Sequence, residues 1–345
     1  MKFTCIDSFS GAGGLGLGLK ESGFEILYSF DLEPHSVETQ LLNKQYFSHR
    51  IEALDIKNLD PKKTMELLDI KKGELTLFAG GPPCQGFSIQ RIGEDIDDRN
   101  DLVSIYMRKM VAFSPKFFLM ENVPGITGKR GKQILQGALE YAEKNGYFIH
   151  KKILNAQDFG VPQRRKRLVI VGEKTTSKPK FQFPTPTQHQ TTVRDAIFDL
   201  PTPPENGADH PILIHHRRDR LSDTNLRRLQ ALGPGQGMEH LPQHLLAECH
   251  KLGASKIGHR NVYGRMHWDK VAPTITARFD SFTRGQFGHP EQDRSISLRE
   301  GAILQTFPLD FVFSGNKVDI ARQIGNAVPP RLAYEIGRQI INTLE

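Results

Sequence analysis

The sequence has few cysteines and no long apolar segment. Cys5, Cys84 and Cys249 are the only cysteines in 345 residues. Three thiols this far apart form neither a disulfide framework nor a paired zinc motif. No apolar run approaches the roughly 18 residues of a membrane span, and the N-terminal segment lacks the apolar stretch of a signal peptide. These absences argue against a disulfide-stabilised secreted protein and a membrane protein, and they predict an intracellular one.

Repeats and low-complexity tracts are also absent, and the composition is ordinary. Hydrophobic residues make up 38% of the chain and charged residues 25%, as in globular proteins. The length is sufficient for about two domains. The net charge of +7 permits a polyanionic partner without identifying one, and a merely basic surface explains it equally well.

Strand-like and helix-like segments alternate in the first half of the chain. Apolar runs rich in β-branched and aromatic residues predict strands within 2–9, 25–33, 74–83, 115–125 and 167–173. Helix-like stretches such as 130–146 separate them. This alternation predicts an α/β fold with a mostly parallel sheet.

The alternation stops after about Lys174. The segment that follows is rich in Pro, Thr and Lys, which favours a linker, and no α/β rhythm returns before about Pro290. Nine of the 13 histidines lie between His189 and His267. Their spacing matches no zinc motif, so we expect a separate basic domain without a metal. The predicted divisions are 1–175, 176–290 and 291–345.

A Gly-rich turn follows the first predicted strand. Gly11, Gly13 and Gly16 match G-x-G-x-x-G between a strand and a helix. Glycines there let the backbone approach a ligand beside a helix N-terminus. Asp31 ends the next strand, where a carboxylate can accept hydrogen bonds from ribose hydroxyls. The pattern predicts an adenosine-containing cofactor and leaves NAD and S-adenosylmethionine open; a turn that serves only tight packing is the alternative.

Cys84 stands in the stretch GGPPCQGFS, at the carboxyl end of a predicted parallel strand. That edge of a parallel sheet is where ligands bind. Pro82 and Pro83 restrict the backbone before the thiol, and Gly86 lets the chain turn away after it. The arrangement favours a positioned nucleophile, although a lone cysteine is more often buried and inert.

Three further motifs accompany Cys84. Glu121 ends the neighbouring strand in ENVPG, the basic run QRRKR spans 163–167, and GNAVPP spans 325–330. Taken singly, they read as a strand-end carboxylate, a solvated basic run and a loop. Their combination and order are far more specific.

These blocks resemble the cytosine-C5 DNA methyltransferases. The matching stretches are DSFSGAGGLGLGL, GGPPCQGFS, ENVPG, DFGVPQRRKRLVIVG, LREGAILQTFP and RQIGNAVPP. The resemblance covers about 1–175 and 290–345, and the middle corresponds to the family's variable target-recognition region. It implies a Rossmann-like S-adenosylmethionine-dependent methyltransferase domain, a smaller irregular target-recognition domain, and a C-terminal segment that returns to the catalytic domain.

The resemblance also implies a reaction. Cys84 would add to C6 of a flipped-out cytosine in double-stranded DNA, with Glu121 at N3. Arg165 and Arg167 would favour the thiolate and hold the O2 atom of the base. Residues 85–101 would form a mobile loop that closes over DNA. The enzyme would be a monomer of the bacterial cytoplasm, accompanied by a restriction endonuclease that acts on the same site without being bound to it.

The cofactor contacts implied by the resemblance involve both ends of the chain. Asp31 would bind the ribose, Leu32 would pack on adenine where an aromatic residue is common, and Asp55 with Ile56 would recognise the adenine. The complete implied set is Phe9, Gly11, Gly13, Gly14, Asp31, Leu32, Asp55, Ile56, Pro83, Leu102, Asn326 and Val328.

Three other functions compete with this one. Some tRNA cytosine-C5 methyltransferases share the fold, but the Cys-Phe-Thr element that they have in common is absent, since Cys249 lies in AECHKLG. An NAD-dependent oxidoreductase leaves Cys84, Glu121 and QRRKR without a joint purpose. The presence of both Cys84 and Glu121 argues against a catalytically silent DNA-binding protein.

Overall fold

The structure is a computed structural model that describes residues 2–83, 102–129, 131–248 and 262–345. Its internal contacts divide the chain into two compact units. Unit 1 comprises Met1–Asn155, Lys166–Pro186 and Val328–Glu345; unit 2 comprises Ala156–Arg165 and Thr187–Ala327. This division rests on contacts alone, and the roles assigned above to 1–175, 176–290 and 291–345 stay predictions.

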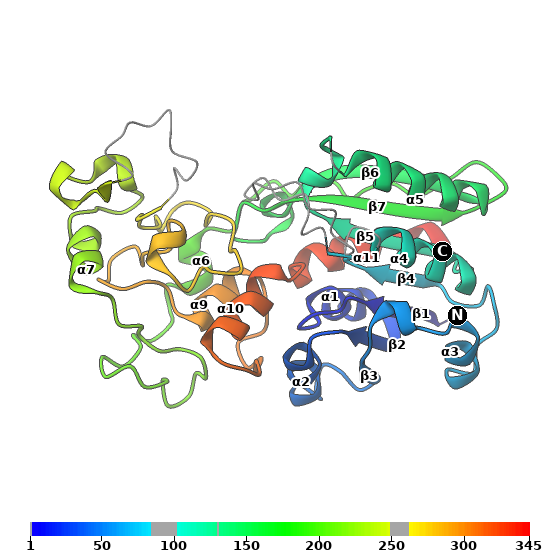
Figure 1. The fold of residues 1–345 in the computed structure, drawn as a ribbon, viewed down its shortest axis with the longest axis horizontal. Helices are drawn as coiled ribbons and strands as arrows, with labels where there is room; N and C mark the ends of the chain where they lie inside the picture. Colours follow the sequence, from blue (N-terminus) through cyan, green and yellow to red (C-terminus); the bar gives the residue numbers. More distant parts are fainter. Residues whose placement is uncertain (1, 84–101, 130, 249–261) are drawn as a thin grey trace. The chain divides into compact units, whose positions relative to one another are not determined.

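Unit 1 is built on a seven-stranded sheet of order β3-β2-β1-β4-β5-β7-β6 (Figure 1). The strands are β1 Phe3–Ser8, β2 Phe24–Asp31, β3 Arg50–Ala53, β4 Leu77–Gly80, β5 Phe117–Asn122, β6 Tyr147–Asn155 and β7 Lys166–Lys174. The five strands from β3 to β5 in this order are parallel, whereas β7 pairs antiparallel with both β5 and β6. The prediction of a mostly parallel α/β sheet is confirmed. The sequence analysis did not identify β3 or β6.

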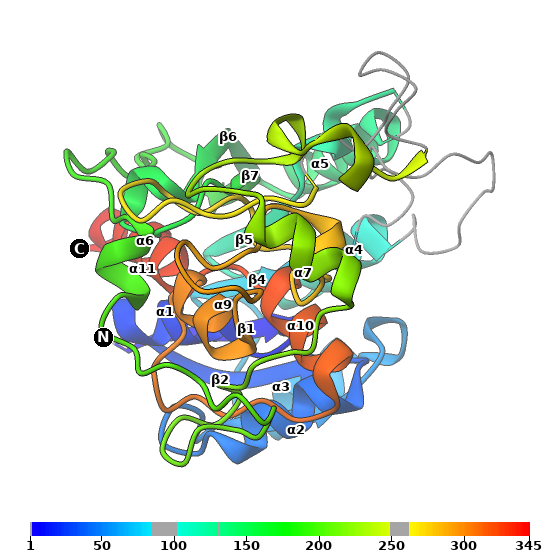
Figure 2. The ribbon, with the colours of Figure 1, turned by 90° about the vertical axis from the view of Figure 1, so that its left-hand side faces the viewer.

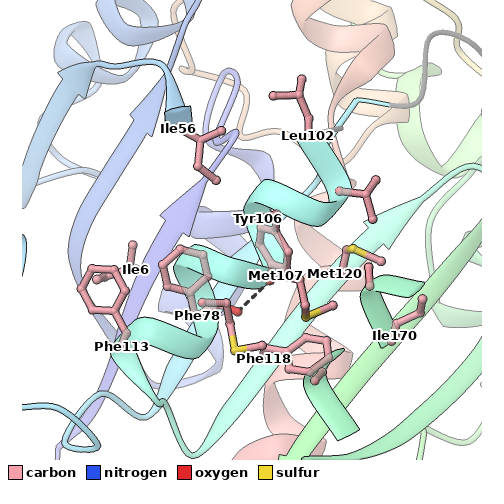
Figure 3. Packing of buried hydrophobic residues seen from close by; sticks show 14 of the residues in the cluster. Ile6, Ile56, Phe78, Leu102, Tyr106, Met107, Phe113, Phe118, Met120 and Ile170 are labelled. Carbon is pink, nitrogen blue, oxygen red and sulfur yellow. Dashed lines mark hydrogen bonds between the residues drawn. The ribbon is translucent and has the colours of Figure 1, made fainter. Parts of the chain in front are cut away.

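Helices cover the sheet of unit 1. They are α1 Gly14–Ser22, α2 Pro34–Leu42, α3 Pro61–Leu67, α4 Leu102–Phe113, α5 Lys132–Lys144 and α11 Pro330–Leu344, with the 3-10 helices η1 Ile56–Asn58 and η3 Pro124–Thr127. On one face the central strands pack against α4, where the rings of Phe78 and Tyr106 meet edge-on (Figure 3). The Tyr106 hydroxyl donates to the carbonyls of Phe78 and Leu119 at 3.1 and 3.0 Å, so this buried polar group is satisfied.

The helix α1 packs closely against α11. Three glycines within its nine residues make α1 a poor helix by propensity alone. A Cβ at Gly18 would lie 2.0 Å from the Pro330 carbonyl oxygen, and one at Gly337 would lie 2.2 Å from Ser22 Oγ. The absence of side chains at these positions lets the two backbones approach, and the resulting packing offsets the weak intrinsic propensity of α1.

A carboxyl group is buried beneath α1. Asp7 on β1 is 1% exposed, and within the described residues neither of its carboxyl oxygens has a hydrogen-bond partner. Burial is the main cause that raises the pKa of Asp7; the backbone amide of Gly16 opposes it and the charge of Asp31 adds to it, and together they place the pKa at about 8. The carboxyl is therefore mostly protonated in the folded protein at neutral pH.

Unit 2 has short helices joined by long irregular segments (Figure 2). They are α6 Val193–Ile197, α7 Asp223–Gln230, α9 Leu298–Leu304 and α10 Lys317–Asn326, with 3-10 helices η4 Ala156–Phe159, η5 Met238–His240, η6 Gln243–Leu245 and η7 Phe282–Arg284. Buried arginines satisfy carbonyl oxygens that no regular structure pairs. Arg265 donates to four carbonyls and Arg299 to three. These side chains replace the backbone partners that a sheet would provide.

Among the residues described in both units, no helix is long and apolar enough to cross a membrane.

We predict that Gly18→Ala lowers stability by about 1–3 kcal/mol, because the added methyl group overlaps the backbone of α11. The matched control is Gly137→Ala in α5, where a Cβ would meet nothing within 4 Å and where alanine should stabilise by about 0.5–1 kcal/mol. Urea and thermal unfolding midpoints measure both changes. Equal midpoints for Gly18→Ala and the wild type would contradict the close packing of α1 on α11.

We predict that Asp7→Asn removes a pH dependence of stability. Below pH 4 the carboxyl is protonated in both the folded and the unfolded chain. Between pH 4 and about 8 the unfolded chain loses this proton and the folded protein retains it, so the free energy of unfolding falls by roughly 1.4 kcal/mol per pH unit. The variant should therefore melt above the wild type at pH 8 and converge with it near pH 4.

The exposed Asp69→Asn variant controls for the loss of a carboxylate as such. If the melting temperatures of the wild type and Asp7→Asn changed with pH in the same way between pH 4 and 8, Asp7 would not carry a proton in the folded protein.

Candidate active site

The turn between β1 and α1 has a backbone suited to glycine. Gly11 and Gly13 have φ angles of 53° and 88°, and Phe9 also lies at 53°, in the left-handed region. A Cβ at Gly13 would lie 2.5 Å from the ring of Phe47, whereas one at Gly11 would meet nothing within 4 Å. The backbone at Gly11 therefore borders open space, where a ligand can approach closely.

Asp31 closes this turn from the end of β2. Its Oδ2 accepts a hydrogen bond from the Gly11 amide at 2.8 Å, and its Oδ1 accepts one from the Glu33 amide at 2.9 Å. Burial raises the pKa of Asp31, while the two backbone hydrogen bonds lower it. Each oxygen keeps a further lone pair, so Asp31 can still accept hydrogen bonds from hydroxyl groups.

Gln40 is a residue of this site that the sequence analysis missed. From α2 its Nε2 donates to the Gly11 carbonyl at 2.7 Å and to Ser10 Oγ at 2.8 Å, while its Oε1 accepts from Ser29 Oγ. Gln40 is 1% exposed. The side chain of Gln40 therefore holds the Gly-rich turn in place through hydrogen bonds to Ser10 and Gly11. A glutamine inside an amphipathic helix gives no local signal of such a role.

The residues predicted to bind adenine lie near the ends of β2 and β3 and at the start of α4. Leu32 is 68% exposed. The Leu54 amide donates to the Asp31 carbonyl, which brings the segment before Asp55 beside β2. Asp55 Oδ1 caps η1 by accepting from the Lys57 amide at 2.9 Å. Ile56 and Leu102 are buried in one apolar cluster.

These features fit S-adenosylmethionine. The cap residue of α1, Gly13, contributes no side chain to the helix N-terminus, so the first amides of α1 are left for other acceptors. Gly11 faces open space, Asp31 has spare lone pairs for a ribose, and Leu32 offers an exposed apolar side chain for a flat base. Phe9 directly follows β1, Gly14 is the first residue of α1, and Pro83 lies three residues after β4.

Glu121 and Arg167 face each other across two antiparallel strands. Glu121 lies on β5 and Arg167 on β7, and Arg167 Nε is 2.7 Å from Glu121 Oε1. The side chains are only 12% and 13% exposed. Glu121 Oε1 is itself buried and has no hydrogen-bond partner in the described part of the chain, so its contact with Arg167 is an ion pair.

The end of β4 is fixed against Glu121. A Cβ at Gly81 would lie 3.4 Å from Glu121 Oε2. The side chain of Asn122 donates to the Pro82 carbonyl at 2.9 Å and accepts from the Val123 amide. The sequence analysis assigned no role to Asn122, although it stands inside ENVPG. Cys84 and the predicted mobile loop 85–101 lie outside the described residues, and the described chain ends one residue before Cys84.

Arg165 lies in a different setting from Arg167. It belongs to unit 2, is fully buried, and donates to the carbonyls of Ile275, Gly325 and Ala327, each at 2.9 Å. Gln163 of the same run donates to Leu304 O and Gln305 Oε1. The structure brings Arg167 to Glu121, and it places Arg165 in the framework of unit 2.

The last predicted cofactor residues lie on either side of the division between the units. Asn326 is exposed at the end of α10 in unit 2, whereas Val328 is buried and belongs to unit 1. In the part of the chain that the structure describes, no three His, Cys, Asp or Glu side chains are grouped to hold a metal ion.

Comparison with known proteins places this site in a family. The family model of the C-5 cytosine-specific DNA methylases matches residues 3–342. Type II methylase M.HgiDII of Herpetosiphon aurantiacus is 36% identical, over 99% of this chain and 95% of its own length. Type II methyltransferase M1.HphI of Haemophilus parahaemolyticus is 35% identical, over 99% of this chain and 87% of its own.

Solved structures agree with the fold. An E. coli prophage protein assigned as a DNA modification methyltransferase superposes with a TM-score of 0.76 at 25% identity, covering 99% of both chains. The methyltransferase EhMeth of Entamoeba histolytica superposes with a TM-score of 0.68 at 17% identity, covering 100% of this chain and 99% of its own, which supports the fold alone.

The motifs and the full-length match lead to one conclusion. The methyl donor of such enzymes is S-adenosylmethionine, which the Gly-rich turn and its surroundings fit. The chain belongs to the C-5 cytosine-specific DNA methylase family and is a DNA cytosine-C5 methyltransferase.

Proposed function

We propose that this DNA cytosine-C5 methyltransferase adds the thiolate of Cys84 to C6 of a cytosine flipped out of duplex DNA. One observation carries the proposal. The Glu121–Arg167 ion pair lies at the edge of the sheet where Asn122 anchors Pro82, two residues before Cys84. Glu121 and Asn122 are consecutive residues, so one hydrogen bond connects the Glu121–Arg167 pair to the segment that leads to the predicted nucleophile.

The chemistry follows from these groups. Addition of the thiolate to C6 breaks the C5–C6 double bond and makes C5 an enamine-like nucleophile. Glu121 offsets the negative charge that develops on the ring by sharing a proton with N3. Arg167 holds Glu121 in place and has further N–H groups for the O2 atom. C5 would then take the methyl group from the sulfonium of a bound S-adenosylmethionine, with S-adenosylhomocysteine as the leaving group. Loss of the C5 proton to a base and elimination of the Cys84 thiolate from C6 would regenerate the aromatic ring as 5-methylcytosine.

Different residues contact different parts of the methyl donor. When bound, S-adenosylmethionine supplies a methyl group on a positively charged sulfur, which is the electrophile for C5. Asp31 accepts from the ribose hydroxyls, Leu32 packs on the adenine, and Asp55 with Ile56 recognises the edge of the adenine. The other assigned residues are Phe9, Gly11, Gly13, Gly14, Pro83, Leu102, Asn326 and Val328.

Arg165 is assigned a positioning role rather than contact with the base. Its guanidinium donates to three backbone carbonyls of unit 2, which supports a role in holding residues 275, 325 and 327. Residues 176–290, most of which lie in unit 2, are assigned to target recognition.

The biological setting is inferred from relatives. M.HgiDII and M1.HphI are both named as Type II enzymes. We therefore assign this chain to a restriction-modification system in the bacterial cytoplasm. It would act as a monomer on a specific duplex sequence that a separate restriction endonuclease also cleaves.

The direct test offers tritiated S-adenosylmethionine with duplex DNA or with tRNA. We expect label in DNA only, and bisulfite sequencing should locate 5-methylcytosine in one short sequence context. Duplex DNA containing 5-fluorocytosine should form a complex that survives denaturation, because fluorine cannot leave as a cation, whereas Cys84→Ala should form none. Label in tRNA alone would overturn the DNA substrate, and an adduct formed by Cys84→Ala would overturn the nucleophile.

We predict that Glu121→Gln and Arg167→Met each slow single-turnover methylation by about 100- to 10,000-fold. The double variant should be little slower than the worse single variant, because both residues act through one ion pair. The control is Lys166→Gln, an exposed neighbour in the same basic run, which should keep most of the activity. Additive losses in the double variant would show that the two residues act independently.

A further inference from the structure

Lys109 connects α4 to the segment that carries the predicted adenine-recognising pair. From the third turn of α4 its Nζ donates to the Lys57 carbonyl at 3.2 Å and to the Leu59 carbonyl at 2.5 Å. Both carbonyls lie at the C-terminal end of η1, and η1 begins with Ile56 directly after Asp55. A single side chain thus links two elements about fifty residues apart.

These carbonyls need such a partner. The last carbonyls of a helix accept no hydrogen bond from within the helix. A 3-10 helix of only three residues also has little stability of its own. An ammonium group satisfies them with hydrogen bonds and also favours the negative end of the helix. At the other end, the carboxylate of Asp55 caps η1 through the Lys57 amide. Opposite charges therefore hold the two ends of η1.

Apolar packing fixes the same two elements side by side. Ile56 and Leu59 are each 2% exposed and share a core cluster with Leu102 at the start of α4. Ile56 and Leu102 lie on the two neighbouring elements above the aromatic core of the sheet (Figure 3). The segment 55–56 and Leu102 are the two sides of the predicted adenine site, and Lys109 is the polar link between the elements that bear them.

We propose that Lys109 is a positioning residue for S-adenosylmethionine, which sets the place of Asp55 and Ile56 relative to Leu102 and thereby the affinity for the adenine. The proposal rests on the assignment of that adenine site under the proposed function. Lys109 acts through η1 and touches no reacting atom. Its loss should weaken cofactor binding while the chemical step at saturating cofactor stays nearly unchanged.

The test compares Lys109→Met, which keeps the aliphatic stem, with Lys109→Arg, which restores two donors. By calorimetric titration with S-adenosylhomocysteine, we expect Lys109→Met to raise Kd about tenfold, as loss of a charge-assisted hydrogen bond implies. Lys109→Arg should recover most of the affinity. The kcat for DNA methylation should stay within about twofold of the wild type. The matched control is Lys116→Met, at an exposed lysine just after α4.

Two further readouts separate positioning from general damage. Hydrogen exchange of residues 54–60 in the cofactor-free protein should speed up in Lys109→Met and not in Lys109→Arg or Lys116→Met. S-inosylhomocysteine lacks the adenine amino group. The ratio of its Kd to the Kd of S-adenosylhomocysteine should be smaller in Lys109→Met than in the wild type.

Each outcome has a definite meaning. An unchanged Kd for Lys109→Met, or losses that Lys109→Arg does not restore, would overturn the proposal while leaving the methyltransferase function intact. A wild-type protein that binds no S-adenosylhomocysteine would overturn the proposed cofactor site and this proposal together.

Discussion

The hydrogen bond from the side chain of Asn122 to the Pro82 carbonyl is the constraint on which the proposed catalytic edge of unit 1 depends. Pro82 and Pro83 have no amide N–H, so the chain after β4 can be anchored there only through its carbonyl groups. Asn122 supplies that anchor from the end of β5. It fixes the segment that leads to Cys84, while Arg167 on β7 forms an ion pair with Glu121.

The same physical device recurs wherever the backbone leaves regular structure. Gln40 holds the Gly-rich turn, Lys109 holds the end of η1, and Arg165 holds carbonyls in unit 2. In each case a buried or partly buried side chain with several donors satisfies backbone groups that no strand or helix pairs. Polar groups left unpaired in such places cost stability, so these side chains determine the geometry of the loops that carry function.

Local sequence patterns predict the fold best where function and pattern coincide. The apolar runs before the Gly-rich turn, before Pro82 and through Glu121 identified three parallel strands, and their carboxyl ends gave the edge of the site. β3 was missed because it has four residues and no buried side chain, and β6 because polar and exposed positions interrupt its apolar pattern. The antiparallel placement of β7 between β5 and β6 was not predicted, since local patterns carry no information on pairing partners.

The sequence by itself determined the family and the methyl donor, and it predicts the reacting groups, because the chemistry demands particular residues in short motifs. Only the tertiary structure decided which arginine of QRRKR meets Glu121. Arg165 and Arg167 are two positions apart, yet the chain passes from unit 2 into β7 between them. The roles of Gln40, Asn122 and Lys109 were likewise decided in three dimensions, because the groups that they bind come from other parts of the chain and local sequence does not record long-range contacts.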